Sequence, residues 1–92
     1  MSLLESGENY LETILVLTQR NGSVRSIDVA NEMNFTKPSV SRAMSILKRE
    51  NLIIMEADGR LVLTEEGLKK ATAILERHTI LTRFISEVLG VP

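Results

Sequence analysis

The sequence contains no cysteine and no tryptophan, and it has only one tyrosine and two phenylalanines among its 92 residues. The lack of cysteine excludes a disulfide scaffold, a thiolate metal site and a cysteine nucleophile. No apolar run approaches the roughly 20 residues of a membrane-spanning helix, and no basic flank precedes the first apolar residues, so we expect neither a membrane span nor a signal peptide. We therefore expect a cytoplasmic protein.

The motifs of the common catalytic sites are absent as well. The sequence has no glycine-rich phosphate-binding loop after a strand, no Gly-x-Ser-x-Gly segment and no His-Glu-x-x-His segment. A single histidine, His78, and the lack of cysteine leave few ways to place a nucleophile next to a base. We therefore expect no enzymatic activity and no small organic substrate.

Charge is unevenly distributed along the chain, although the net charge of −1 gives no overall sign of a nucleic-acid partner. Residues 1–19 contain three acidic and no basic residues, whereas residues 20–64 contain seven basic and five acidic residues. The centre of the basic part is the segment TKPSVSRAMSILKREN, residues 36–51, which has no acidic residue before Glu50. With 43% hydrophobic residues the chain can form a core, and its length suits one small domain or one module.

Three helices are predicted in the first half of the chain. Apolar residues spaced three and four apart predict a helix from about Gly7 to Arg20, with Ser6 as its N-cap. A second helix is predicted after Ser26 as its cap, and a third after Thr36, with Pro38 in its first turn. The residues of the second and third helices that are predicted to face the core are Ile27, Ala30, Met33, Val40, Ala43, Met44 and Leu47.

A β-hairpin and a fourth helix are predicted in the second half. Strands over residues 52–56 and 61–64 flank Asp58-Gly59, which is a strong signal for a hairpin turn. Thr64 is predicted to cap a helix from residue 65 to about residue 89. The inward positions of this helix are predicted to include Leu68, Ala71, Ile74 and Leu75. Three helices, two strands and a helix, in this order, form a winged helix-turn-helix, a mainly α fold with a small β-hairpin.

In such a fold one side of the third helix stays free, and its residues suit DNA binding. Small side chains allow the backbone to come close to a duplex, and the unpaired N–H groups of the first turn can bind a phosphate. Arg42 is long enough to reach guanine in the major groove, and Arg60 at the wing tip is placed to enter the flanking minor groove. A merely solvated basic face is the alternative, but the helix-turn-helix and the wing together favour DNA. The residues predicted to bind DNA are Arg25, Lys37, Pro38, Ser39, Ser41, Arg42, Lys48 and Arg60.

A separate group of residues has the chemistry of a metal site. Asn9 and Glu12 share a face of the first helix at a spacing of three, and His78 lies on the last helix. A carboxylate, an amide oxygen and an imidazole can together hold Mn²⁺ or Fe²⁺. Spacing alone does not favour this site over the ordinary interpretation, in which the histidine packs and the acidic residues are solvated or interact with the helix dipole.

Four segments of the sequence resemble the N-terminal part of the DtxR/MntR family of metal-dependent repressors. These segments are ENYLETILVL, VRSIDVANEMNFTKPSVSRAMSILKRENLI, GRLVLTEEGLKKA and ERHTILTRFISEVLGV, and the resemblance extends from about Gly7 to Val91. It rests on the combination of Tyr-Leu-Glu in the first helix, Pro-Ser-Val-Ser in the third, Leu-Thr-Glu-Glu-Gly after the wing and Arg-His before LTRF. Members of this family are prokaryotic dimers that bind Mn²⁺ or Fe²⁺ and then grip palindromic operators of metal-uptake genes.

The resemblance also implies roles for individual residues. Glu12 and His78 match metal-ligand positions of the family, and Asn9 falls where the family places an Asp or Met ligand. The residues that match positions touching DNA are Thr36, Pro38, Ser39 and Arg42, which adds Thr36 to the predicted interface.

Three features depart from the family pattern. Asn9 is neutral, so the predicted metal site has one charge fewer than a version with Asp. Thr82 stands four residues after His78, where some iron-type members carry a Glu ligand. The sequence ends at Pro92, where the dimerisation helices and further ligands of the family normally follow.

We therefore expect a repressor that binds a palindromic operator in double-stranded DNA as a homodimer, responds to Mn²⁺ or Fe²⁺ and controls metal homeostasis genes. Residues 1–6 are interpreted as a disordered or vector-derived start, residues 7–76 as the DNA-binding domain and residues 77–92 as the truncated start of a helical dimerisation region. Two alternatives remain: a metal-independent winged-helix regulator, and a winged-helix protein-interaction module whose basic face meets an acidic partner.

Overall fold

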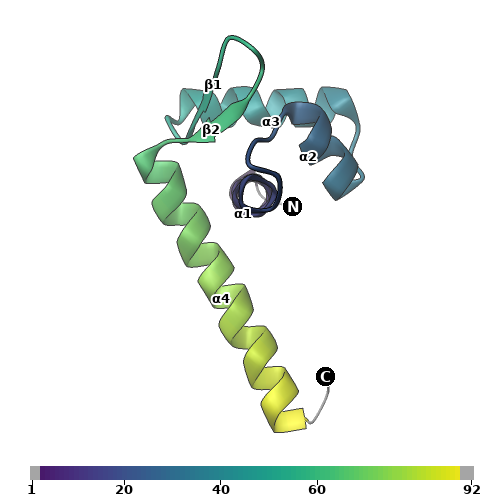
Figure 1. Cartoon of the computed structure of the whole chain (residues 1–92), viewed down its shortest axis with the longest axis vertical. Coiled ribbons are helices and arrows are strands. Elements are labelled where there is room, and N and C mark those ends of the chain that lie inside the picture. The colour runs from purple at the N-terminus through teal and green to yellow at the C-terminus, as the bar shows by residue number, and fades with distance from the viewer. Residues whose placement is uncertain (1–2, 90–92) are drawn as a thin grey trace.

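The predicted order of elements is confirmed by a computed structural model, which describes the backbone of residues 3–89 and the side chains of residues 7–79. The elements are α1 (Leu3–Asn21), α2 (Ser26–Met33), α3 (Lys37–Arg49), β1 (Ile53–Met55), β2 (Leu61–Leu63) and α4 (Glu65–Leu89). Figure 1 shows α1 between the helix-turn-helix and α4, with the hairpin beside α3. Over the described part of the chain, no helix is both long enough and apolar enough to cross a membrane.

Helix α1 forms the centre of the fold and starts earlier than predicted. It begins at Leu3, so Ser6 lies inside the helix and its prediction as the N-cap is wrong. The preceding Leu and Glu residues are good helix formers, and nothing in the segment stops the helix at Ser6. The helix ends at Asn21. Gly22 follows with a left-handed φ of +85°, and its N–H donates to the Thr18 carbonyl at 2.8 Å. The buried residues of α1 are Tyr10, Leu11, Ile14, Leu15 and Leu17.

Helix α2 begins one residue earlier than predicted, and it buries a different side from the one predicted. The N-cap is Arg25 rather than Ser26, and the Arg25 backbone N–H donates to the Asp28 carboxylate at 2.8 Å. Val29 is fully buried, whereas Ile27, which was predicted to face the core, is 40% exposed. These two residues lie on nearly opposite sides of the helix, so burying one exposes the other. The prediction for Ile27 is therefore wrong.

The hairpin has shorter strands than predicted but turns at the predicted residues. Ile53 pairs with Leu63, Ile54 with Val62 and Met55 with Leu61 in an antiparallel register. Gly59 has φ +90°, which a glycine adopts without strain, and its N–H donates to the Glu56 carbonyl at 2.9 Å. The segment before α2 extends this sheet, because Arg25 forms an isolated antiparallel bridge with Arg60. The Leu61 N–H also donates to the Val24 carbonyl at 2.8 Å.

Helix α4 starts against the base of the hairpin. Thr64 caps it as predicted, because the Gly67 N–H donates to the Thr64 hydroxyl oxygen at 3.0 Å. A Cβ atom at Gly67 would collide with the Leu52 carbonyl oxygen, so the close approach requires glycine. Because the side of α4 that carries Gly67 and Ala71 faces the fold, Leu68 points outward and is 46% exposed, contrary to the prediction. Figure 1 shows α4 running away from the hairpin and past α1.

Candidate nucleic-acid interface and metal-ligand pair

The start of α3 is fixed by its own capping residues. Thr36 is the N-cap as predicted. Its hydroxyl oxygen accepts a hydrogen bond from the Ser39 backbone N–H at 3.3 Å, and its O–H donates to the Ser39 hydroxyl oxygen at 2.8 Å. Pro38 lies in the first turn, where its missing N–H costs no helical hydrogen bond. The buried residues of α3 are Val40, Met44 and Leu47, which anchor the helix from behind.

The opposite side of α3 is open to solvent. The residues predicted to bind DNA are all exposed: Arg25, Thr36, Lys37, Pro38, Ser39, Ser41, Arg42, Lys48 and Arg60. Among the described side chains, no carboxylate lies within ion-pair distance of Lys37, Arg42 or Lys48. The helix also has no acidic residue in its first turn, where an acid would occupy the free N–H groups. The α3 face is defined here as Thr36, Lys37, Pro38, Ser39, Ser41, Arg42 and Lys48. It offers unpaired positive charge next to exposed hydroxyl groups.

The wing tip holds its positive charge differently. The Arg60 guanidinium Nε lies 2.7 Å from the Asp58 carboxylate, and the Arg60 backbone N–H donates to the same carboxylate at 3.1 Å. Arg25 reaches the turn from α2, where its Nε donates to the Asp58 carbonyl at 3.2 Å. The hydrogen bond from the Arg60 backbone, followed by the charges of Arg60 and Arg25, lowers the pKa of the Asp58 carboxyl. The fold thus brings two predicted DNA-binding residues to Asp58, Arg60 at its carboxylate and Arg25 at its backbone carbonyl.

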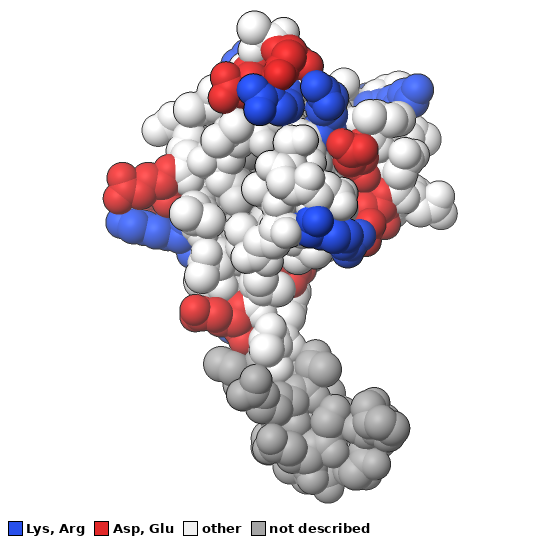
Figure 2. Space-filling view, in the orientation of Figure 1, with Lys and Arg blue, Asp and Glu red and all other residues white. Residues whose placement is uncertain are grey.

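This contact of Asp58 was missed in the sequence, where Asp58 was interpreted only as a turn former. A signal was present, because an Asp two residues before an Arg across a tight turn can place opposite charges side by side. Figure 2 shows the result on the surface, where acidic and basic atoms lie next to one another over the hairpin at the top of the view.

Two of the three predicted metal ligands are brought into contact. The Nδ1 atom of His78 on α4 lies 2.6 Å from a carboxylate oxygen of Glu12 on α1. Their side chains are 53% and 21% exposed, so the pair is open to ions from solution. Asn9 lies one turn before Glu12, and its side chain is exposed. The backbone carbonyl of Asn9 accepts a hydrogen bond from the Thr13 hydroxyl at 2.9 Å.

The donors of this pair suit Mn²⁺ or Fe²⁺ in chemistry. Within residues 7–79, however, no three His, Cys, Asp or Glu side chains converge on one point. Glu12 and His78 would supply only part of a coordination sphere, and the remaining ligands of such a site would have to come from elsewhere. Thr82, which stands where some family members have a Glu ligand, lies outside the residues whose side chains are described.

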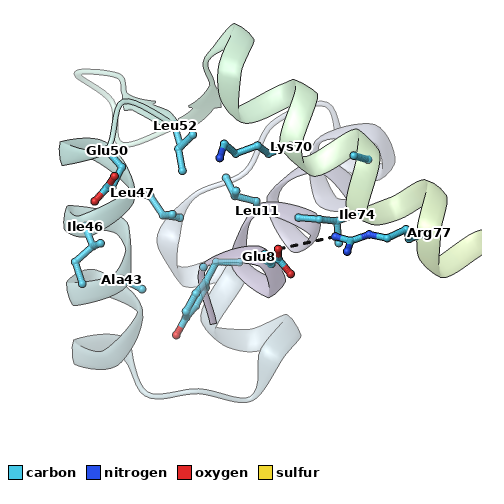
Figure 3. Close-up of a pocket in the computed structure, with 13 residues that line it drawn as sticks. Glu8, Leu11, Ala43, Ile46, Leu47, Glu50, Leu52, Lys70, Ile74 and Arg77 are labelled. Carbon is cyan, nitrogen blue, oxygen red and sulfur yellow. Dashed lines mark ion pairs between the residues drawn. The ribbon is translucent and has the colours of Figure 1, made fainter. Parts of the chain in front are cut away.

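A cavity of about 440 Å³ lies between α1, α3 and α4, and it was not anticipated from the sequence. Small residues on each of the three helices, Gly7, Ala43 and Ala73, contribute to its wall and leave the space open. Figure 3 shows the ion pair between Glu8 and Arg77 at one side of the cavity, and its N···O distance is 3.9 Å. The cavity is lined by residues of α3 on one side and of α1 and α4 on the other, and these last two helices also carry the Glu12–His78 pair.

A family model matches most of the chain. The model of the iron-dependent repressor, N-terminal DNA-binding domain, matches residues 2–61. The HTH-type transcriptional regulator MntR of Listeria welshimeri is 34% identical over 86 residues, covering 94% of this chain and 60% of that protein. The iron-dependent repressor IdeR of Mycobacterium tuberculosis is 30% identical over 90 residues, covering 98% of this chain.

The same relationship is seen in three dimensions. The crystal structure of T. acidophilum IdeR superposes with a TM-score of 0.86 at 25% identity, covering 92% of this chain and 40% of that one. The chain thus spans about two fifths of the length of the iron-dependent relatives, with 39% of the Mycobacterium protein covered.

Proposed function

The chain belongs to the iron-dependent repressor family, and on this premise we propose that it is the DNA-reading part of a metal-responsive transcriptional repressor. The observation that carries the proposal is the α3 face, where exposed hydroxyl and cationic side chains lie opposite the buried Val40, Met44 and Leu47. A helix supported from behind and open in front has the form in which helix-turn-helix proteins enter the major groove.

Each part of this face has a role in the proposed complex. The first turn of α3 binds a phosphate through the Lys37 backbone N–H and the Ser39 hydroxyl, because Pro38 has no N–H and the Ser39 N–H is bonded to Thr36. Arg42 reads base edges, and Lys37 and Lys48 bind phosphates on either side of the groove. Arg60 follows the backbone into the flanking minor groove.

Metal binding and dimerisation belong to the same proposal. Glu12 and His78 would hold a Mn²⁺ or Fe²⁺ ion between α1 and α4, with Asn9 as a third candidate ligand. The ion would supply the positive charge that keeps a carboxylate and an imidazole together. Because α1 and α4 also line the cavity behind α3, a change in their spacing would change the space behind α3. In a homodimer, two α3 helices would then meet half-sites of a palindromic operator about one helical turn apart.

A salt titration tests the proposal on the chain itself. The affinity for a duplex of about 30 base pairs would be measured by fluorescence anisotropy as salt rises from about 50 to about 200 mM. If each of the three unpaired cations of the α3 face, Lys37, Arg42 and Lys48, releases a counterion, the affinity should fall about fortyfold over this range. Lys48→Ala should reduce the slope of log affinity against log salt by about one.

Lys70→Ala is the matched control for this experiment. It removes the same charge from an exposed position on α4, beside the cavity rather than on the α3 face, and should leave the slope unchanged. Binding that ignores salt, or that responds equally to both substitutions, would contradict the proposed interface and favour a protein partner.

A further inference from the structure

Asp58 places a negative charge at the tip of the wing that is proposed to approach DNA. The wing carries a second acidic residue, Glu56, which is also exposed but forms no ion pair with a described residue. Asp58 by contrast binds Arg60 at 2.7 Å, with the two side chains 48% and 49% exposed. The two acidic residues therefore have the same charge and lie on the same hairpin, but only Asp58 forms an ion pair with an arginine.

The turn around Asp58 is also fixed to the helix-turn-helix. Arg25, the N-cap residue of α2, donates its Nε–H to the Asp58 carbonyl at 3.2 Å. The Arg25 side chain lies across the turn, because a Cβ atom at Gly59 would be 3.9 Å from its Cδ and Nε atoms. The bridge between Arg25 and Arg60 joins the same two segments through the backbone. Arg25 therefore fixes the backbone at Asp58, and Arg60 contacts its carboxylate.

We propose that Asp58 sets the selectivity of the wing by competing with DNA phosphate for Arg60. The inference rests on the proposed function, because it concerns how the same surface meets DNA. A carboxylate and a phosphate offer similar anionic oxygens to a guanidinium, so Arg60 exchanges one anion for another when it moves to the duplex. Where the groove is narrow and its potential more negative, the exchange is favourable. On other sequences the exchange gains little, and Asp58 suppresses binding there.

The ionisation state of Asp58 agrees with this role. The backbone N–H of Arg60, together with the neighbouring guanidinium charges, lowers the pKa of Asp58, so the carboxylate remains charged at neutral pH. It is therefore a permanent competitor under the conditions in which the protein would bind DNA.

Asp58→Asn and Glu56→Gln form a matched pair for the test. Each removes one negative charge from the same hairpin, but only the first removes an arginine partner. With a duplex of about 30 base pairs and mixed sequence, Asp58→Asn should tighten binding about two- to fivefold, because Arg60 no longer gives up a surface ion pair. The salt slope should steepen by up to about one, because a phosphate contact of Arg60 then releases a counterion. Glu56→Gln should change both quantities much less.

A second background separates competition from general electrostatics. When Asp58→Asn is added to Arg60→Gln, the affinity for DNA should change no more than it does for Glu56→Gln. The reason is that residue 60 then carries no guanidinium for Asp58 to hold. Asp58→Glu, which keeps the charge, should restore weaker binding to mixed-sequence DNA. Thermal unfolding of each variant verifies that the hairpin and helices remain folded.

Selectivity itself is measured with a duplex that the wild type enriches from a randomised pool. The ratio of affinities for this duplex and the mixed-sequence duplex should fall in Asp58→Asn and stay close to wild type in Glu56→Gln. Equal tightening by both variants, or weaker binding by Asp58→Asn, would overturn the inference alone. Salt-independent binding by the wild type would instead overturn the proposed function, and this inference with it.

Discussion

The α3 face and the wing tip carry the same kinds of cations but hold them in opposite ways. On α3, Lys37, Arg42 and Lys48 have no carboxylate partner among the described residues. At the wing tip, Arg25 and Arg60 both contact Asp58. A count of charges would treat the two surfaces as equals. The contacts show that the positive charge of α3 is available to a phosphate at once, whereas that of the wing is already engaged.

The two surfaces also differ in what supports them. The α3 face stands on Val40, Met44 and Leu47, which are almost fully buried. The outer side of the hairpin is apolar yet exposed, with Ile54 at 52% and Val62 at 41%. The position of α3 therefore depends on the core, while that of the wing tip depends on hydrogen bonds and one ion pair.

The largest expected effect comes from removing the support of the α3 face. Met44→Ala should lower the free energy of unfolding by about 2–5 kcal/mol, because it deletes a buried side chain and leaves a cavity. Ile54→Ala truncates an exposed residue of the wing and should stay within about 0.5 kcal/mol of wild type. Chemical denaturation measures both values. Similar losses for the two variants would contradict the difference in support.

The next largest effect is the loss of DNA affinity when one arginine is removed from each surface. Arg42→Ala should reduce DNA affinity about tenfold or more and weaken discrimination between sequences, because an unpaired guanidinium on α3 is free to read bases. Arg60→Ala should reduce affinity only about two- to fivefold, because Arg60 must first leave Asp58. Anisotropy titrations at one fixed salt concentration compare them. A larger loss for Arg60→Ala would reverse the proposed order of the two surfaces.

A smaller effect is the broadening of NMR signals by a bound metal ion, which would show where the metal site lies relative to both surfaces. Added Mn²⁺ is paramagnetic and should broaden the amide NMR signals near Glu12 and His78 while leaving those of the wing turn sharp. His78→Ala should remove most of this broadening, and Glu56→Gln, which deletes an acid on the wing, should not. If the signals of Asp58 and Gly59 broadened first, the ion would bind at the wing and not between α1 and α4.

The smallest effect is the titration of Asp58. Because contacts with Arg60 lower its pKa in the folded protein, the contribution of the ion pair to stability is present above the ordinary pKa of aspartate. It is lost as the pH falls through the lowered value. Carbon-13 NMR of the carboxyl group should therefore give a midpoint below that of an ordinary aspartate. In Arg60→Gln the midpoint should rise only part of the way, because the backbone N–H, the largest cause, remains.

Capping and turn residues predicted the helices and strands well, because each acts on the backbone within a few residues of itself. Thr36 followed by Pro38 defines the start of α3, and Asp58-Gly59 defines the hairpin turn. The predictions of burial fail where residues far apart in the sequence determine which side chains are buried. Ile27 and Val29 are equally apolar, and only packing against the rest of the fold determines which is buried. Leu68 points outward because Gly67 presses against Leu52, a contact that no periodicity reveals.

The candidate site was predictable in part for the same reason. The exposure of the α3 face follows from helical spacing, so its residues could be named before the structure. Their roles in binding DNA, like those of Asn9, Glu12 and His78 in binding metal, stay predictions. The 2.6 Å contact between Glu12 and His78 joins residues 66 positions apart, and the spacing within either helix gave no reason to expect it. The pairing of Asp58 with Arg25 spans the chain in the same way.

The glycine at the base of α4 has a mechanical consequence. Gly67 rests directly on the Leu52 backbone, and Ala71 and Ile74 bury the same side of α4 over the next two turns, while its 25 residues extend for about 38 Å. The start of the helix therefore has little room to move. His78 lies eleven residues after Gly67, so a change in its contact with Glu12 would shift the later turns of α4 more than the turns beside the hairpin.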